Sequence, residues 1–265
     1  MTALFPIRFV TGSLVLALCF ASCKKDEVST TPDPEPTTPS TGAFKLEFKN
    51  KVDTAALVFG KNYTTSKGDT FKVSKFNYYI SNIKLLKSDL SGYVESNSYH
   101  MVKHSSPSSC IINLTGVPPG SYQSVSFMLG VDSARNVSGA QTGDLDPAVA
   151  SDMYWSWNSG YIFMKMEGTS PQSGETSKNL EYHIGGYGGV NKTQRPFKFD
   201  FGSTPITIAV NTAPTIEVNA NVNALFVTPN PIDFKTRYTI VSPGPNAKLM
   251  ADNYATMMSF VKIRN

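Results

Sequence analysis

Apolar residues alternate with polar residues on a period of two in several segments of this chain. Alternation of this kind places every second side chain on one face, which is typical of a half-buried strand. The segments are 44–48 (FKLEF), 125–131 (VSFMLGV), 197–201 (FKFDF), 206–210 (ITIAV) and 216–222 (IEVNANV). Turns rich in Gly, Pro, Asn and Ser, such as GVPPGSY, separate them. Because no alternation of strands and helices suggests a parallel sheet, the pattern predicts an antiparallel β-sandwich.

Near the C-terminus this alternation stops. Four apolar side chains recur there at the spacing of one helical face: Met250, Tyr254, Met257 and Met258. We therefore expect a short C-terminal α-helix that packs on the sheets. The fold class predicted for residues 43–265 is all-β, an antiparallel β-sandwich with a short C-terminal α-helix, in one domain.

The first residues have the pattern of an export signal. Arg8 precedes an apolar run over residues 9–20 that is too short for a membrane span, and the ending FASC resembles a bacterial lipobox. We predict a lipoprotein signal peptide over residues 1–22 and a lipidated Cys23, with an ordinary signal peptide as the alternative. The following KKDE resembles the signal that sends lipoproteins of Bacteroidetes to the cell surface, which predicts a lipid anchor in the outer membrane.

Residues 23–42 begin with Cys23 and continue as a Pro- and Thr-rich run with almost nothing apolar to bury. This composition predicts an extended tether. Once the signal is removed and Cys23 is lipidated, Cys110 has no partner for an intrachain disulfide. Its place before the apolar run IINL favours a small buried residue over a nucleophile.

Composition narrows the functional classes. With 265 residues, 40% of them hydrophobic, the chain can bury the core of a globular protein. Its formal charge of +4 is spread along the sequence, so we expect no nucleic-acid partner. The sequence contains no nucleophile elbow, HExxH, Walker loop or CxxC pair, so we do not expect an enzyme.

The three histidines are candidate metal ligands. His100 and His104 belong to YHMVKH, where a strand would hold them about 13 Å apart. That separation is too large for one ion with ligand bonds of about 2 Å. His183 precedes a glycine-rich turn in YHIGGYGG, and a hydrogen-bonded structural histidine is the alternative to a ligand there.

Four aspartates flank or stand in the loop DSARNVSGAQTGDLDPAVASD: Asp132, Asp144, Asp146 and Asp152. Their oxygens could hold a hard cation such as calcium, but the spacing does not match an EF-hand loop. We expect these residues to form turns and cap helices.

Both tryptophans, Trp155 and Trp157, stand in YWSWNSGY. As strand residues they would share one face and belong to the core, or they could form an exposed stacking platform. The Asn, Ser and Gly after Trp157 suit an accessible loop better than a packed interior.

Six segments resemble, in order, the MbnP-like family of periplasmic and surface proteins: FNYYISNIKLLKSD, YHMVK, SYQSVSFMLGVDSARNVSGAQTGDLDP, MYWSWNSGYIFMKMEG, YHIGGYGG and MADNYATMMSF. The resemblance implies copper binding, because the founding members, from methanotrophs, are copper-binding proteins. In those members a partner diheme enzyme, similar to MauG and to bacterial cytochrome c peroxidases, oxidises a tryptophan to kynurenine. The same kind of partner is therefore implied for this chain.

The resemblance implies a copper site made from an oxidised indole and an imidazole. An intact indole N–H can only donate, whereas the aryl amine of kynurenine can join an imidazole around Cu(I), a soft ion. WSW supplies Trp155 or Trp157 as the oxidisable residue, and YHIGG supplies His183 as the imidazole.

Some positions near these motifs depart from the copper-binding relatives. FKNKVDTAAL has no histidine where one is expected, and RYTIV has Tyr238 in place of another. The nearby thioethers of Met153, Met164 and Met166 could compensate, although filling the core is the role that we expect for them.

These features together predict an outer-membrane lipoprotein with an MbnP-like domain that binds or handles copper and does not turn over a substrate. The alternative is a surface module without metal, which binds carbohydrate or protein by stacking on the tryptophans.

Overall fold

A computed structural model describes residues 40–265, apart from Ala140, Ser151 and Ser159. The predicted signal peptide, Cys23 and nearly all of the tether lie outside the described residues. Within the described part, no helix is both long enough and apolar enough to cross a membrane.

The smaller of two main sheets contains the first and the last strand. Its strands run in the order β18–β16–β1–β2, and β7 also pairs with β1. They are β1 (Gly42–Val52), β2 (Ala55–Ala56), β7 (Ile111–Val117), β16 (Thr215–Asn221) and β18 (Met258–Arg264). The alternating apolar residues of segments 44–48 and 216–222 are buried, as the sequence predicts.

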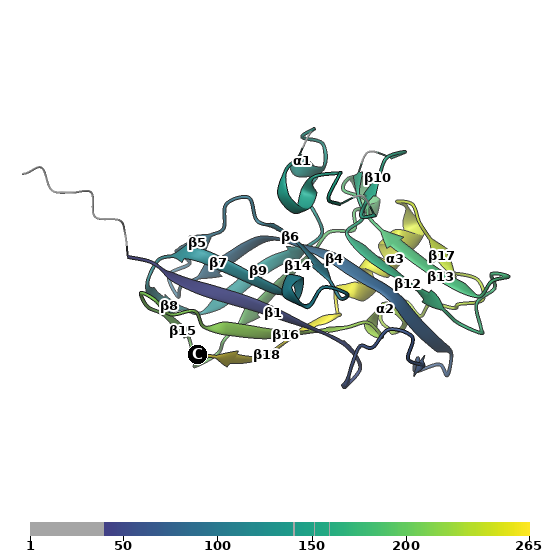
Figure 1. The fold of residues 1–265 in the computed structure, drawn as a ribbon, viewed down its shortest axis with the longest axis horizontal. Helices are drawn as coiled ribbons and strands as arrows, with labels where there is room; N and C mark the ends of the chain where they lie inside the picture. The colour runs from purple at the N-terminus through teal and green to yellow at the C-terminus, as the bar shows by residue number, and fades with distance from the viewer. Residues whose placement is uncertain (1–39, 140, 151, 159) are drawn as a thin grey trace, which may run out of the picture. The chain divides into compact units, whose positions relative to one another are not determined.

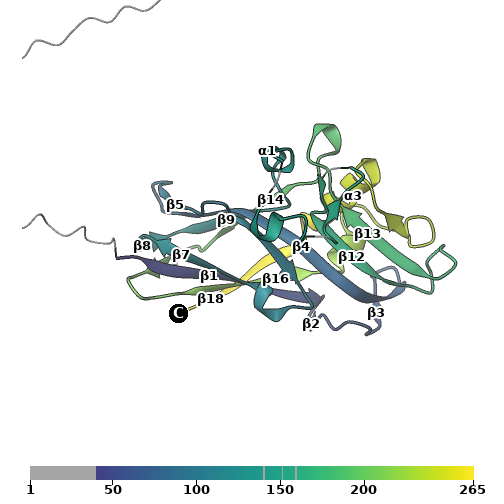
Figure 2. The same cartoon turned by 45° about the horizontal axis from the view of Figure 1, so that its top comes forward.

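The larger sheet is built around one long strand, β4 (Thr70–Leu86). It runs in the order β14–β9–β4–β12–β13–β17, and β3, β5 and β6 also pair with β4. These strands are β3 (Tyr63–Thr64), β5 (Gly92–Val94), β6 (Tyr99–Lys103), β9 (Ser124–Leu129), β12 (Met164–Thr169), β13 (Asn179–Ile184), β14 (Arg195–Asp200) and β17 (Thr239–Ile240). Figure 2 shows β1, β16 and β18 as a lower layer, with β5, β9 and β14 above them.

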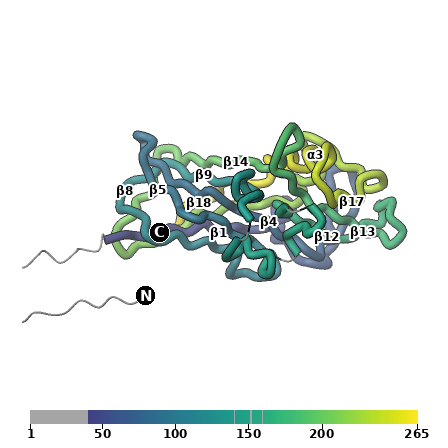
Figure 3. The backbone as a smooth tube through the Cα atoms, turned by 90° about the horizontal axis from the view of Figure 1, so that it is seen from above, coloured from purple at the N-terminus to yellow at the C-terminus, as the bar shows by residue number. Residues whose placement is uncertain are grey.

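Short elements complete the described chain. Two further strand pairs are β8 (Gly120–Tyr122) with β15 (Ile206–Ile208), and β10 (Tyr154–Trp155) with β11 (Gly160–Tyr161). The helices are α1 (Ser133–Asn136), α2 (Ala224–Val227) and α3 (Pro245–Tyr254), with 3₁₀ turns η1 (Pro107–Cys110), η2 (Gly143–Leu145) and η3 (Gly189–Asn191). Helix α3 contacts α2, β13 and β14, and Figure 3 shows it at the edge above β17.

Aromatic side chains join the two layers. Phe48 of β1 meets Phe127 of β9 edge-on, with ring centroids 5.8 Å apart, and Tyr78 of β4 at 6.0 Å. All three rings are buried, and such pairs contribute about 0.5–1.5 kcal/mol each beyond the burial of their area. These contacts confirm the predicted packing of one sheet on another.

Two strands pair with the same edge of β4, one before Tyr79 and one after it. We call this branching point at Tyr79 the fork. Strand β12 pairs with residues 72–78 of β4, and β9 pairs with residues 80–86. The Tyr79 N–H donates to the Phe163 carbonyl (2.9 Å), and its own carbonyl accepts from the Gly130 N–H (2.9 Å). Gly130 has φ +120°, and a Cβ there would lie 3.0 Å from the Phe163 ring. Only glycine therefore fits this close approach without strain.

Two details differ from the sequence prediction. Among the paired strands described, β1·β16 and β13·β17 are parallel, and all other pairs are antiparallel. The C-terminal helix is present, but it ends at Tyr254, so Met257 and Met258 do not lie on it. Met258 begins β18 because the last apolar residues pair with β16, where Met258 faces Ala220 and Phe260 faces Val218.

Candidate metal centre

The tryptophan segment leaves the larger sheet at the fork and returns to it there. Residues 131–162 connect Gly130 to Phe163, the two residues bonded to Tyr79. This connection carries α1 and the β10–β11 hairpin, which stand above the sheets at the top of Figure 1. The Tyr79 hydroxyl donates to the Asp144 carbonyl (2.9 Å), so the residue at the fork also holds the connection itself.

A buried asparagine fixes the hairpin to α1. The Asn136 side chain donates to the Val131 carbonyl (2.8 Å) and accepts from the Tyr161 N–H (3.2 Å). The hairpin is closed at its base by the Ile162 N–H, which donates to the Met153 carbonyl (2.8 Å). Since buried polar groups of this kind are costly to leave unpaired, they hold the hairpin in one position.

The two tryptophans have opposite environments. Trp155 is 5% exposed and belongs to the core, whereas Trp157 is 65% exposed. Their ring centroids lie 5.7 Å apart with the planes inclined by 47°. The core and the exposed interpretations of the sequence therefore each hold for one of the two residues.

Trp155 lies against the backbone that follows His183. A Cβ on Gly185 would lie 2.8 Å from Cζ3 of Trp155 and 2.5 Å from the Tyr161 carbonyl oxygen. Real Cβ atoms do not approach other atoms so closely, so the position requires glycine. Gly185 is two residues beyond His183, and the structure thereby brings Trp155 to the end of the strand that carries the predicted imidazole.

A charged network surrounds His183 on the outer face of β12 and β13. Its Nε2 lies 2.9 Å from Oε1 of Glu167. Lys165, directly across from His183 in the strand register, lies 3.4 Å from the same oxygen and donates to the Asp152 carbonyl (2.7 Å). Lys75 lies 3.2 Å from an Asp152 carboxylate oxygen and 3.6 Å from the second Glu167 oxygen. The network therefore ties the loop before the hairpin to the strands beneath it.

These contacts shift the pKa values of His183 and Glu167. Burial lowers the pKa of His183, and the Lys165 charge lowers it further, against the hydrogen bond and charge of Glu167, which raise it. Partial burial alone would raise the pKa of Glu167, but the hydrogen bond from His183 and the two lysine charges bring it below its usual value. At neutral pH the site therefore holds a neutral imidazole and an ionised carboxylate.

The unmodified Trp155 and His183 offer one metal donor between them. If Nε2 of His183 carries the proton donated to Glu167, Nδ1 keeps a lone pair for a metal, as in carboxylate–histidine–metal arrangements. Trp155 offers only an indole N–H, which is no ligand. Among the described residues, no group of three or more His, Cys, Asp or Glu is close enough to hold an ion. Beside His183, a copper ion would therefore need a further donor that the intact indole of Trp155 does not supply.

The other candidates from the sequence have structural partners. Met153, Met164 and Met166 are fully buried in the core. Asp132 caps α1 by accepting from the Arg135 N–H (3.0 Å), and Asp146 accepts from the Ala148 N–H (2.9 Å) in a turn, as predicted.

The remaining histidines and acids lie in separate environments. Asp144 accepts from the Met101 N–H (2.6 Å) and Asp152 pairs with Lys75. His100 pairs with Glu95 (2.9 Å), whereas the Asn50 amide lies 3.3 Å from Nδ1 of His104. His100 and His104 therefore have different partners. Their spacing in the sequence likewise predicts that they do not share one metal ion.

Glu167 and Lys165 are the residues that sequence reasoning missed. Both stand in FMKMEG, where their alternation with Met164 and Met166 places them on the face opposite the core. That face could have been predicted from the period of two. Their position beside His183 could not, because it depends on the register of β12 against β13.

We predict that the His183 pKa responds oppositely to two substitutions. Glu167→Gln should lower it further, because it removes the charge that favours the imidazolium, and Lys165→Met should raise it. A folded pKa below the unfolded value of about 6.5 means that the unfolded chain binds more protons. The contribution of His183 to stability is then present above that value and is lost as the pH falls through the folded pKa. NMR titration of the imidazole protons measures these shifts, and a higher pKa in Glu167→Gln would contradict the network.

Comparison with known proteins agrees with the resemblance seen in the sequence motifs. The family model of MbnP matches residues 41–248. Among solved structures, MbnP from Methylosinus trichosporium has a similar fold, with a TM-score of 0.51 and 16% identity, covering 72% of this chain and 79% of that one. No curated protein matches the sequence. The family match extends over most of the described residues, and this chain therefore belongs to the MbnP family.

Proposed function

We propose that this chain is an exported lipoprotein whose MbnP domain binds Cu(I) after Trp155 has been oxidised, without turning over a substrate. The observation that carries the proposal is the contact of Trp155 with Gly185, two residues beyond His183. The family resemblance supports copper as the ion. The number of ligands supports the need for oxidation, because His183 is the one imidazole of this network.

Oxidation would convert a residue that cannot bind metal into one that can. Cleavage of the indole C2–C3 bond with addition of two oxygen atoms, followed by hydrolysis that releases formate, leaves an aryl amine and a ketone. Two equivalents of peroxide, activated by a diheme partner similar to MauG, the class of enzyme that the resemblance implies, would supply the two oxygen atoms and be reduced to two waters. The amine nitrogen would then complement Nδ1 of His183, with Glu167 fixing the orientation of the imidazole.

The exposed tryptophan provides the route to the buried one. A heme partner too large to enter the core can approach Trp157, which is 65% exposed, but not Trp155, which is 5% exposed. The two rings lie 5.7 Å apart, so an electron can leave Trp155 through Trp157. We therefore assign Trp155 as the modified residue and Trp157 as its relay.

The nearby positive charges favour a monovalent ion. Lys75 and Lys165 both lie within 4 Å of Glu167, the residue that contacts His183. A second positive charge on the ion would add to the repulsion from these lysines. Cu(I) is therefore better suited to this network than Cu(II).

The lipobox-like FASC and the following KKDE support an address on the outer membrane, with Cys23 as the lipidated residue. A lipid anchor would place the copper site near the surface of the cell, where a protein that acquires or handles metal can meet its ion.

A stacking module for carbohydrate is the second candidate, and one observation favours it. Trp157 is exposed, and a separate hollow of about 480 Å³ is lined by Tyr154, Tyr161 and Tyr187. The exposed face of Trp157, or the aromatic rings that line this hollow, would suit the stacking of a sugar ring.

The copper proposal predicts that oxidation of Trp155 increases Cu(I) binding. Co-expression with a diheme peroxidase-like partner should convert Trp155, seen in peptide mapping as the loss of one carbon and the gain of one oxygen, and should raise Cu(I) binding. His183→Ala should abolish the gain, because one ligand of a two- or three-coordinate site is removed. His100→Ala, which lies outside the site, is the matched control. Unmodified tryptophans and saturable oligosaccharide binding that Trp157→Ala removes would favour the stacking module instead.

The proposed lipid anchor at Cys23 can be tested separately. In the native host, Cys23→Ala should release soluble protein from the membrane fraction, whereas Cys19→Ala, within the predicted signal peptide, should leave the protein membrane-bound. Retention of the Cys23→Ala variant in membranes would contradict the lipid anchor.

A further inference from the structure

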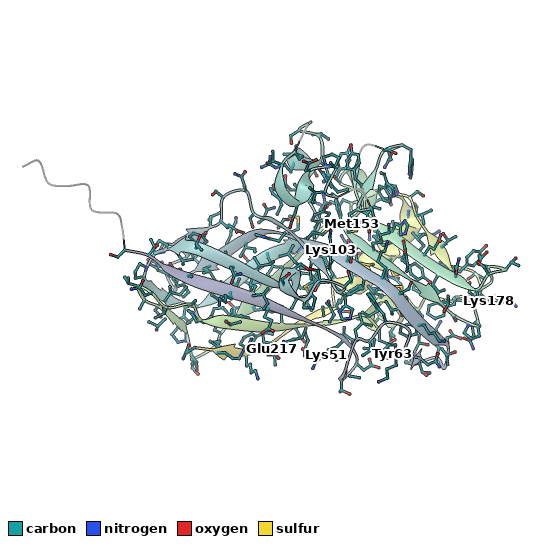
Figure 4. All side chains as sticks on the ribbon, in the orientation of Figure 1. Lys51, Tyr63, Lys103, Met153, Lys178 and Glu217 are labelled. Atoms are coloured by element: carbon teal, nitrogen blue, oxygen red, sulfur yellow. The ribbon has the colours of Figure 1, made fainter. Side chains whose placement is uncertain are left out.

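A gap in the pairing of β1 opens a cavity away from the tryptophan hairpin. Pairing with β7 ends at Glu47 opposite Ile111, and pairing with β2 begins at Lys51 opposite Ala56. The cavity at this gap has a volume of about 520 Å³ and is lined by apolar side chains, by charged side chains at its β strands, and by Asn50, His104 and Cys110. Figure 4 labels Lys51 and Glu217, which also line it, along the lower strands, and Met153, next to the hairpin in the sequence, above them.

Asn50 is held in one orientation by a buried tyrosine. The Tyr78 hydroxyl donates to Oδ1 of Asn50 (2.9 Å), and burial keeps Tyr78 protonated by raising its pKa. The amide nitrogen of Asn50 must then face the cavity. It lies 3.3 Å from Nδ1 of His104 and 4.0 Å from Sγ of Cys110. Because this nitrogen can only donate, Nδ1 of His104 carries a lone pair.

The two donors are held by rigid surroundings. The His104 ring packs edge-on against Phe59 with centroids 4.8 Å apart, and burial lowers its pKa, so the imidazole is neutral. Cys110 ends η1, and Sγ lies 3.7 Å from the Lys103 carbonyl. Burial raises the pKa of this thiol, although Lys49 acts in the opposite direction. A neutral imidazole and a thiol thus point toward the same amide group.

We propose that Nδ1 of His104 and Sγ of Cys110 form a second metal site, for a soft monovalent ion such as Cu(I), independent of Trp155 and His183. A thiolate ligand selects soft ions such as Cu(I), and an imidazole also binds copper. On binding, the S–H bond breaks, the sulfur electron pair binds the ion, and the proton leaves to solvent. A thiolate and a monovalent cation are together neutral, so binding adds no net charge to a cavity whose lining already holds two lysines and two glutamates beside Phe48, Leu57 and Ile111. Glu47, one of the two carboxylates that line the cavity, is already paired with Lys49 and Arg264.

Protection of Cys110 from alkylation tests this site in the full-length chain. Iodoacetamide is added with or without one equivalent of chelator-buffered Cu(I), and mass spectrometry of the Cys110 peptide separates it from Cys19 and Cys23. We expect Cu(I) to slow alkylation of Cys110 at least about tenfold, the change that 1.4 kcal/mol of binding at the sulfur would give. His104→Ala should lose the protection, whereas His100→Ala should keep it, because His100 pairs with Glu95 instead.

Two further variants keep the test decisive. His104→Gln retains a polar partner for Asn50 but offers no ring nitrogen, so it should also lose protection while unfolding at a temperature near that of the unaltered chain. His183→Ala should keep the protection of Cys110 even if copper binding at the tryptophan hairpin fails. Equal protection in His104→Gln and the unaltered chain, no protection in the unaltered chain, or loss of protection in His183→Ala would overturn the second site.

Discussion

The backbone of Tyr79 holds two strands against a single edge of β4, and the candidate copper site depends on this arrangement. Its N–H and carbonyl bind Phe163 and Gly130, which are the first residue after the tryptophan segment and the last residue before it. A buried peptide group rarely stays unpaired, so both bonds are needed where one strand gives way to another. The fork therefore fixes both ends of the connection that presents Trp155 and Trp157.

Both candidate sites lie where a strand edge changes partner. On β4 the change from β12 to β9 releases the segment with the hairpin, and on β1 the change from β7 to β2 leaves the cavity of His104 and Cys110. Continuous pairing would fill such places with backbone hydrogen bonds. An interruption instead leaves room for side chains from distant parts of the chain, such as Asn50 and His104, to meet.

The sequence predicts the strands well because alternation reports directly which side chains face the core. Segments 44–48 and 216–222 show this, and the family motifs identify the fold around them. Contacts across strands are harder to predict, because register and connection geometry decide them. The place of Glu167 beside His183 and of Cys110 beside Asn50 depends on such pairings. The opposite exposure of Trp155 and Trp157 depends on how the hairpin rests on Gly185, and the helix was predicted too long because β16 pairs with Met258.

The contact between Trp155 and the Gly185 backbone is the most direct point at which to test the proposed site. In a Trp157→Phe background, which leaves Trp155 as the one fluorophore of its kind, Gly185→Ala should displace the indole. We expect its emission to shift to longer wavelength and its quenching by acrylamide to increase, with a destabilisation of about 1–3 kcal/mol from overpacking. Gly188→Ala, where a Cβ would meet nothing within 4 Å, should change neither property. An unchanged emission spectrum in Gly185→Ala would contradict the placement of Trp155 against Gly185, on which the proposed site depends.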